Sequence, residues 1–127
     1  MSLPQDLYFS KDHEWVKLSD DGVATVGITD YAQNSLGDIV YVELPKVGAT
    51  VAQHTNVGVI ESVKAVSDLF TPVAGVILEV NTALDADSSV LNREPYTDGW
   101  LFKVKDVSSD QLDSLLDPAA YEKLTAE

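Results

Sequence analysis

Short runs of β-branched and aromatic residues, separated by turn signals, fill most of the first 105 residues and restrict the chain to a mainly β fold. The run 14–18 alternates between two faces, as expected of a strand that buries only one side. The Asp-Gly turn signal within 19–22 then predicts a hairpin with the run 23–28. Further strands are expected around residues 39–44, 57–60, 76–80 and 100–104.

Two regions outside these runs predict short helices. Thr29 is the expected N-cap of a helix that Gly37 closes. Near the C-terminus, Ser108 and Gln111 form a capping-box pattern before three spaced leucines, and Pro118 predicts the start of another helix. We therefore expect one domain over residues 1–127, with a core at about 7–105 and a helical segment at 108–126 packed against the sheet.

A faint internal repeat relates two of the predicted strands. The segments 37–42 and 75–80 share glycine, isoleucine, aliphatic and valine positions at an offset of 38 residues. Two copies favour two halves of one sheet related by a pseudo-dyad. The segment 61–70, midway between them, would then form a hairpin at one end of that sheet, with Lys64 near its middle.

Composition excludes several classes of function. The 127 residues include 8 basic and 21 acidic side chains, a formal net charge of −13, which argues against binding to nucleic acid or to an anionic membrane. The absence of cysteine excludes disulfides, thiolate metal sites and a cysteine nucleophile. Since no apolar run could span a bilayer and the N-terminus lacks a signal or transit pattern, we expect a soluble intracellular protein.

No motif indicates intrinsic catalysis or a metal site. His13 lacks the second histidine four residues later that a zinc-protease helix needs. Asp85 and Asp87 lack the glycine required at the sixth position of a calcium loop. Phosphate loops, dinucleotide fingerprints and nucleophile elbows are also missing from the sequence. We therefore predict that the protein is not an enzyme.

Lys64 stands out from this pattern because of its neighbours. Small or aliphatic side chains surround this single cation, and the segment lacks the glycine, asparagine or proline expected at a hairpin tip. Such a tip would present one long flexible side chain, which suits a group that an outside enzyme must reach and modify. The plain alternative is an exposed lysine that only adds solubility.

The stretch Glu61-Ser62-Val63-Lys64-Ala65 resembles the lipoylation site of the H proteins of the glycine cleavage system. The similarity extends from about Leu7 to Leu124. Each further matching segment is weak alone, but together, in order and at the family's spacing, they give a strong signal. These segments are 13–16, 26–33, 36–40, 42–45, 67–68, 72–75, 79–81, 95–96 and 99–101.

The resemblance implies a barrel-sandwich hybrid fold of the lipoyl- and biotinyl-carrier type, with C-terminal helices and lipoic acid in amide linkage on Lys64. It also implies a role in glycine catabolism. The arm would take an aminomethyl group from the glycine decarboxylase (P protein) to the tetrahydrofolate-dependent aminomethyltransferase (T protein). Dihydrolipoyl dehydrogenase (L protein) would reoxidise the arm, and lipoylating enzymes would attach it. The carrier itself would be a monomer.

The resemblance also assigns roles to three acidic residues. Glu61 matches a position associated with recognition by lipoylating enzymes, and Glu14 and Asp68 match positions near the loaded arm, in a cleft. A carboxylate there would pair with the cationic aminomethyl group. Where some relatives carry a histidine near the arm, this chain has Ser35, so no imidazole contact is expected at that position.

Three other interpretations remain open at this point. An H-like carrier could hand a lipoyl or octanoyl group to other enzymes of lipoate metabolism, or the chain could be an interaction domain whose lysine is never modified. A biotinyl carrier is disfavoured, because its acceptor lysine is flanked by methionines and Met1 is the only methionine here. We expect a bacterial cytoplasmic location, or the mitochondrial matrix if the chain is a trimmed eukaryotic one.

Overall fold

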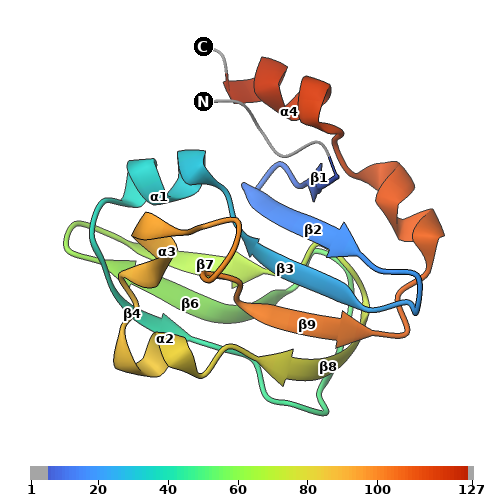
Figure 1. Cartoon of the computed structure of the whole chain (residues 1–127), viewed down its shortest axis with the longest axis horizontal. Coiled ribbons are helices and arrows are strands. Elements are labelled where there is room, and N and C mark those ends of the chain that lie inside the picture. The colour runs from blue at the N-terminus through green and yellow to red at the C-terminus, as the bar shows by residue number, and fades with distance from the viewer. Residues whose placement is uncertain (1–5, 126–127) are drawn as a thin grey trace.

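The computed structural model describes residues 6–125, and its strands form two antiparallel sheets (Figure 1). The larger sheet has six strands in the order β1-β2-β3-β9-β8-β5. These strands are Tyr8–Phe9, Glu14–Leu18, Ala24–Ile28, Phe102–Lys105, Gly75–Val80 and Thr50–Val51, respectively. The smaller sheet has three strands in the order β4-β6-β7, which are Ile39–Glu43, Asn56–Ser62 and Val66–Phe70.

Both predicted hairpins are confirmed, the first from its turn signal and the second from its place between the two copies of the repeat. β2 and β3 pair in register from Glu14 opposite Ile28 to Leu18 opposite Ala24. β6 and β7 pair around the tip that contains Lys64. β4 covers one edge of this second hairpin, whereas β7 is an edge strand.

The prediction of one sheet with two related halves is wrong. β4 and β8, the two copies of the repeat, belong to different sheets. The chain leaves β4 before Pro45, turns through Gly48 at a φ of 91° and enters the six-stranded sheet as β5. The repeat therefore relates one strand of each sheet, and its midpoint hairpin protrudes from the smaller sheet.

Apolar side chains from the facing sides of both sheets form the main core, which includes Val16, Val26, Ile60, Leu69 and Ile77. A second cluster lies on the opposite side of the larger sheet, where Trp15 and Phe9 pack against Tyr121 of the C-terminal helix. The second cluster buries one end of β1 and β2 on both faces. Trp15 is therefore buried, although its strand alternates.

Short helices fill the remaining surface. They are α1 (Asp30–Leu36), α2 (Ala83–Ala86), α3 (Val90–Arg93), the 3₁₀ helix η1 (Ser109–Ser114) and α4 (Pro118–Thr125). The predicted caps of α1 are confirmed, because the Thr29 hydroxyl accepts from the Ala32 N–H and Gly37 follows the last turn at a φ of 79°. In Figure 1, α4 lies above β1, and α1 and α3 lie next to each other at the left of the view.

The predicted capping box at the tail is wrong in one half. Ser108 caps η1 by accepting from the Asp110 N–H. The Gln111 side chain does not turn back to Ser108. It accepts from the Ala74 N–H and donates to the Ala74 carbonyl, at 2.6 and 3.1 Å. The backbone N–H and carbonyl of Ala74, just before β8, need partners, and the Gln111 side chain bonds to them instead of to the helix N-terminus.

Candidate functional site

Lys64 lies at the exposed tip between β6 and β7. The Ser62 N–H donates to the Ala65 carbonyl at 2.8 Å, and the Ser62 hydroxyl oxygen accepts from the N–H groups of Lys64 and Ala65, at 3.3 and 3.1 Å. The Val63 N–H donates to the Asp38 carbonyl at 3.0 Å. A serine side chain thus orders a tip that has no glycine, asparagine or proline.

Around the tip, the side chains leave the lysine accessible. Val63 and Val66 are each 69% exposed. A β-carbon added to Gly37 would lie 3.5 Å from Cε of Lys64, so the aliphatic part of the lysine passes over bare backbone. Among the salt bridges of residues 6–125, none involves Lys64. The amine is therefore presented to solvent on a narrow protrusion.

Two of the predicted acidic residues share the outer face of the three-stranded sheet. The strand registers place one row of side chains across this face nearest the tip, and a second row beyond it. The first row is Tyr41, Glu61 and Val66, and the second is Glu43, Val59 and Asp68. Glu61 is half-buried between two apolar neighbours, while Asp68 is exposed. An acidic face of mixed apolar character therefore lies next to Lys64.

Glu14 lies at the other end of β7 and is only 3% exposed. Its Oε1 accepts from the Ser10 hydroxyl at 2.7 Å, and its Oε2 accepts from the Phe70 N–H at 3.4 Å. Lys64 and Phe70 are six positions apart, which corresponds to about 20 Å of extended chain. The structure thus separates Glu14 from Lys64 by the length of an edge strand, with Asp68 between them.

Burial controls the charge of Glu14. Desolvation raises its pKa from 4.5 to about 7, the Asp12 carboxylate adds to the rise, and the hydrogen bonds from Ser10 and Phe70 oppose it. The carboxyl group is therefore balanced between its neutral and ionised forms near neutral pH. A cation placed beside it would favour the ionised form.

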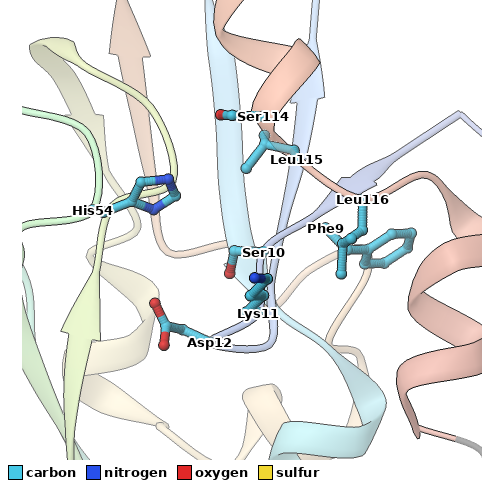
Figure 2. A pocket seen from close by; sticks show the side chains of 8 residues that line it. All are labelled: Phe9, Ser10, Lys11, Asp12, His54, Ser114, Leu115 and Leu116. Carbon is cyan, nitrogen blue, oxygen red and sulfur yellow. The ribbon is translucent and has the colours of Figure 1, made fainter.

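A surface cavity of about 330 Å³ lies beside this turn. Its lining residues are Phe9, Ser10, Lys11, Asp12, His54, Ser114, Leu115 and Leu116. Figure 2 shows the side chains of Asp12 and His54, from different segments, extending into the same opening. Within the described range 6–125, no three His, Asp or Glu side chains are grouped closely enough to hold a metal ion.

Sequence reasoning missed two parts of this arrangement. The hydroxyl of Ser62 as the organiser of the tip could have been found, because serine two residues before a turn often bonds to the following N–H groups. The contact between Glu14 and the end of β7 joins residues 56 positions apart, and no local pattern signals it. No helix in the described part of the chain is long and apolar enough to cross a membrane.

Comparisons with known proteins agree with this geometry. Residues 7–127 match the protein family described as glycine cleavage H-protein. The glycine cleavage system H protein of Pelodictyon phaeoclathratiforme is 52% identical over 128 residues, covering 100% of both chains. That of Escherichia coli O7:K1 is 51% identical over 123 residues, covering 97% of this chain and 95% of the relative.

A solved structure supports the same assignment. The crystal structure of the glycine cleavage system H protein from Mycobacterium marinum has a TM-score of 0.89 and 38% identity, and it covers 98% of this chain and 100% of that one. This likeness confirms the expected fold of antiparallel, barrel-sandwich-like sheets with short helices. The chain belongs to the family of glycine cleavage system H proteins.

Proposed function

We propose that this protein carries lipoic acid in amide linkage on Lys64 and serves as the carrier of a glycine cleavage system. As a member of the H-protein family, the chain is a carrier and not a catalyst. The observation that carries the assignment to Lys64 is the hairpin tip, where an exposed lysine without an ion pair passes over Gly37. When attached, the lipoyl group supplies a disulfide that can carry an aminomethyl group between enzymes.

A tip of this kind suits enzymatic modification. A lysine side chain does not form an amide with a free carboxylic acid in water, so an enzyme must deliver an activated acyl group. We propose that Glu61 contributes to recognition by the lipoylating enzyme. Its half-buried position between Tyr41 and Val66 supports this role, because a carboxylate held by its neighbours gives a partner a fixed anion to bind.

The family name implies partnership with the other components of the glycine cleavage system. We propose that these partners are the glycine decarboxylase, the aminomethyltransferase and dihydrolipoyl dehydrogenase. A net charge of −13, with Glu43, Glu61 and Asp68 on one face beside Lys64, favours basic patches on the partner enzymes.

We further propose that Glu14 and Asp68 receive the loaded arm along the edge of β7. An ammonium group that leaves water needs a paired anion, because its desolvation otherwise exceeds the gain from contact. Glu14 supplies a buried carboxylate at the end of this edge, and Asp68 supplies an exposed one on the way. Release of amine from the loaded carrier, without partner enzymes, should be faster in Glu14→Ala and Asp68→Ala than in the parent. Equal rates in folded variants would exclude this cleft.

We also propose that residues 1–127 form one domain and that the protein works in the bacterial cytoplasm. The core shared by the two sheets and the packing of the C-terminal α4 on the N-terminal β1 support a single unit. The bacterial origin of the similar H proteins supports the location.

Intact-mass measurement in the native host tests the attachment site. The parent protein and the control Lys105→Arg, which changes an exposed lysine at the end of β9, should gain one lipoyl increment. Lys64→Arg should gain none, and a lipoyl increment on Lys64→Arg would disprove the assignment. The modified parent should also support glycine cleavage with the three partner enzymes. If the modified protein does not support glycine cleavage but its acyl group is transferred to other lipoyl domains, a role in lipoate metabolism would be favoured instead.

A further inference from the structure

A hydrogen-bonded cluster behind Glu14 connects its turn to the C-terminal helix. The Tyr121 hydroxyl lies 2.8 Å from Nδ1 of His13 and 2.7 Å from the hydroxyl of Thr29. Tyr121 is 1% exposed, and its ring stacks on Phe9 with centroids 4.6 Å apart. The carrier role proposed above uses none of these three polar groups.

His13 occupies a backbone conformation that few residues with a β-carbon adopt. Its φ is 68°, in the left-handed region. The His13 N–H donates to the Ser10 carbonyl at 3.1 Å, and the Ser10 N–H donates to the Glu14 carbonyl at 2.9 Å. In a three-residue hairpin loop of this kind, glycine is usual at the left-handed position. Contacts elsewhere must therefore hold His13 in place.

Those contacts come from two tyrosines. The His13 ring lies 4.7 Å from the ring of Tyr31 and meets Tyr121 edge-on at 5.7 Å. Burial lowers the pKa of His13, although Asp12 opposes the shift, so the neutral ring can accept from the Tyr121 hydroxyl. Thr29 accepts from the Ala32 N–H and can donate to Tyr121, which gives every hydroxyl in the chain of bonds a partner.

The same turn positions Glu14. The Ser10 hydroxyl donates to the Glu14 carboxylate and accepts from the Glu14 N–H at 3.1 Å. A change in the loop conformation at His13 would therefore move Ser10 relative to Glu14. It would also let water reach the carboxylate, which is now 3% exposed.

We propose that Tyr121 is a positioning residue, which holds the His13 turn so that Glu14 stays at the end of β7 ready to pair with the cationic group on the arm. This inference rests on the proposed role of Glu14. It assigns to α4 a task beyond covering the second apolar cluster. Tyr121 acts through His13 and does not itself contact the arm.

The first test uses the unlipoylated protein and the titration of the Glu14 carboxyl carbon by NMR. In the parent the midpoint should lie near the pKa of about 7 that burial produces. In Tyr121→Phe it should move down toward 4.5, because water then reaches the carboxyl group and removes the desolvation that is the largest cause of the raised pKa. This effect should outweigh the weaker Ser10 hydrogen bond, whose loss alone would raise the pKa. Three other titratable side chains lie around Glu14: Asp12, His13 and Tyr121. A control variant must keep all three.

Tyr96→Phe is the control, because it also removes a single tyrosine hydroxyl, in this case from a half-buried side chain. The Tyr96 hydroxyl accepts from the Asp30 N–H at 3.0 Å and touches neither His13 nor Glu14, so the midpoint should not move. His13→Phe removes the acceptor of the Tyr121 bond, keeps an aromatic ring beside Tyr31 and does not relieve the left-handed conformation. This second variant should lower the Glu14 midpoint as Tyr121→Phe does, and it keeps the test valid if Tyr121→Phe folds poorly. An unchanged midpoint in both would overturn the proposal.

The second test measures amine release from the loaded carrier. Tyr121→Phe should accelerate release about fivefold, the factor that corresponds to one ordinary hydrogen bond. In the His13→Phe background it should add nothing, because both changes break the same link, and additive effects would contradict action through His13. Glu14→Gln separates the two proposals. If it fails to accelerate release, the role of Glu14 is wrong. If it accelerates release while Tyr121→Phe does not, only the positioning role is wrong.

Discussion

At one end of β7, Val63 and Val66 each leave 69% of their surface exposed beside Lys64, whereas at the other end Glu14 is 3% exposed against the Phe70 N–H. The tip is held by a few backbone bonds and one serine hydroxyl. The far end is held by two side-chain bonds to Glu14 and by an aromatic cluster that includes α4. One strand therefore joins a region built for access to a region built for a fixed environment.

This difference corresponds to two requirements on a carrier. The attachment group must reach into the active sites of several enzymes, so its surroundings must be narrow and free of competing contacts. The second requirement is a fixed environment for a charge, and it has a cost. A buried carboxyl group lowers the stability of the fold whenever it is ionised. A costly acid at a site that could hold an apolar residue points to a function for its charge, as the loaded arm would provide.

The largest effect is expected at the buried end, in Glu14→Gln. Folding raises the Glu14 pKa from 4.5 to about 7, so the folded state binds more protons over that interval and its stability falls as pH rises. Ionisation of the buried Glu14 therefore lowers the unfolding free energy by up to about 3 kcal/mol. This loss is complete above pH 7 and absent below pH 4.5. Glutamine can accept from the Phe70 N–H through its amide oxygen and donate to the Ser10 hydroxyl oxygen through its amide nitrogen. The unfolding free energy of Glu14→Gln should therefore exceed that of the parent by up to about 3 kcal/mol at pH 8.

Urea denaturation at pH 8 and at pH 4 measures this difference. At pH 4 the two proteins should be nearly equal, because the parent carboxyl is then neutral in both states. Asp68→Asn, at an exposed carboxylate on the same strand, serves as the control and should change stability by less than about 0.5 kcal/mol at either pH. A gain in Glu14→Gln that is independent of pH would contradict a raised pKa.

The second largest effect should follow from Ser10→Ala, which removes the strongest bond to the carboxylate. Because the Ser10 hydrogen bond lowers the Glu14 pKa, its loss should raise that pKa further. The ionised form loses a charge-assisted bond, so stability at pH 8 should fall by about 1.5–3 kcal/mol, with a smaller loss at pH 4. Ser114→Ala is the matched control. Ser114 lines the same cavity but bonds to Gln53 and Gln111, so its loss should leave the titration of Glu14 unchanged.

How far the sequence could anticipate these two regions depended on the range of their contacts. The tip is a local hairpin, and the repeat around it predicts it, although its residues include no glycine, asparagine or proline as a turn signal. The buried end needs Ser10, Glu14 and Phe70 together, and the strand alternation of residues 14–18 indicates nothing about a partner 56 positions away. The family resemblance indicated that Glu14 matters, but the physical reason became visible only in the folded chain.

Other errors have the same origin. Local capping rules predicted that Gln111 would bond back to Ser108, but the unpaired backbone of Ala74 binds it instead. The repeat suggested a single sheet, because sequence similarity between strands cannot show which neighbours they pair with. The α1 helix was predicted with both caps, since these depend only on residues within one or two turns.

A smaller effect is expected at the tip, in Ser62→Ala. The loss of the bonds from the N–H groups of Lys64 and Ala65 should lower stability by about 0.5–1.5 kcal/mol, because both groups can turn to water. It should also slow enzymatic lipoylation severalfold, since the lysine then samples more orientations. Ser62→Thr keeps the hydroxyl and should restore both properties. Equal lipoylation rates in all three proteins would show that the tip needs no internal order.

The smallest effect is expected for the substitution of valine by threonine at the tip. Val63→Thr exchanges a methyl group for a hydroxyl at a side chain that is 69% exposed, so the unfolding free energy should change by less than about 0.5 kcal/mol. The same exchange at Val73, which is 0% exposed three residues beyond Phe70, buries a hydroxyl in an apolar site and should cost about 1–3 kcal/mol. Urea denaturation of the two isosteric variants measures the contrast directly. If Val63→Thr destabilised the protein as much as Val73→Thr, the tip would be packed like the far end of β7, and its exposure could not account for the accessibility of Lys64.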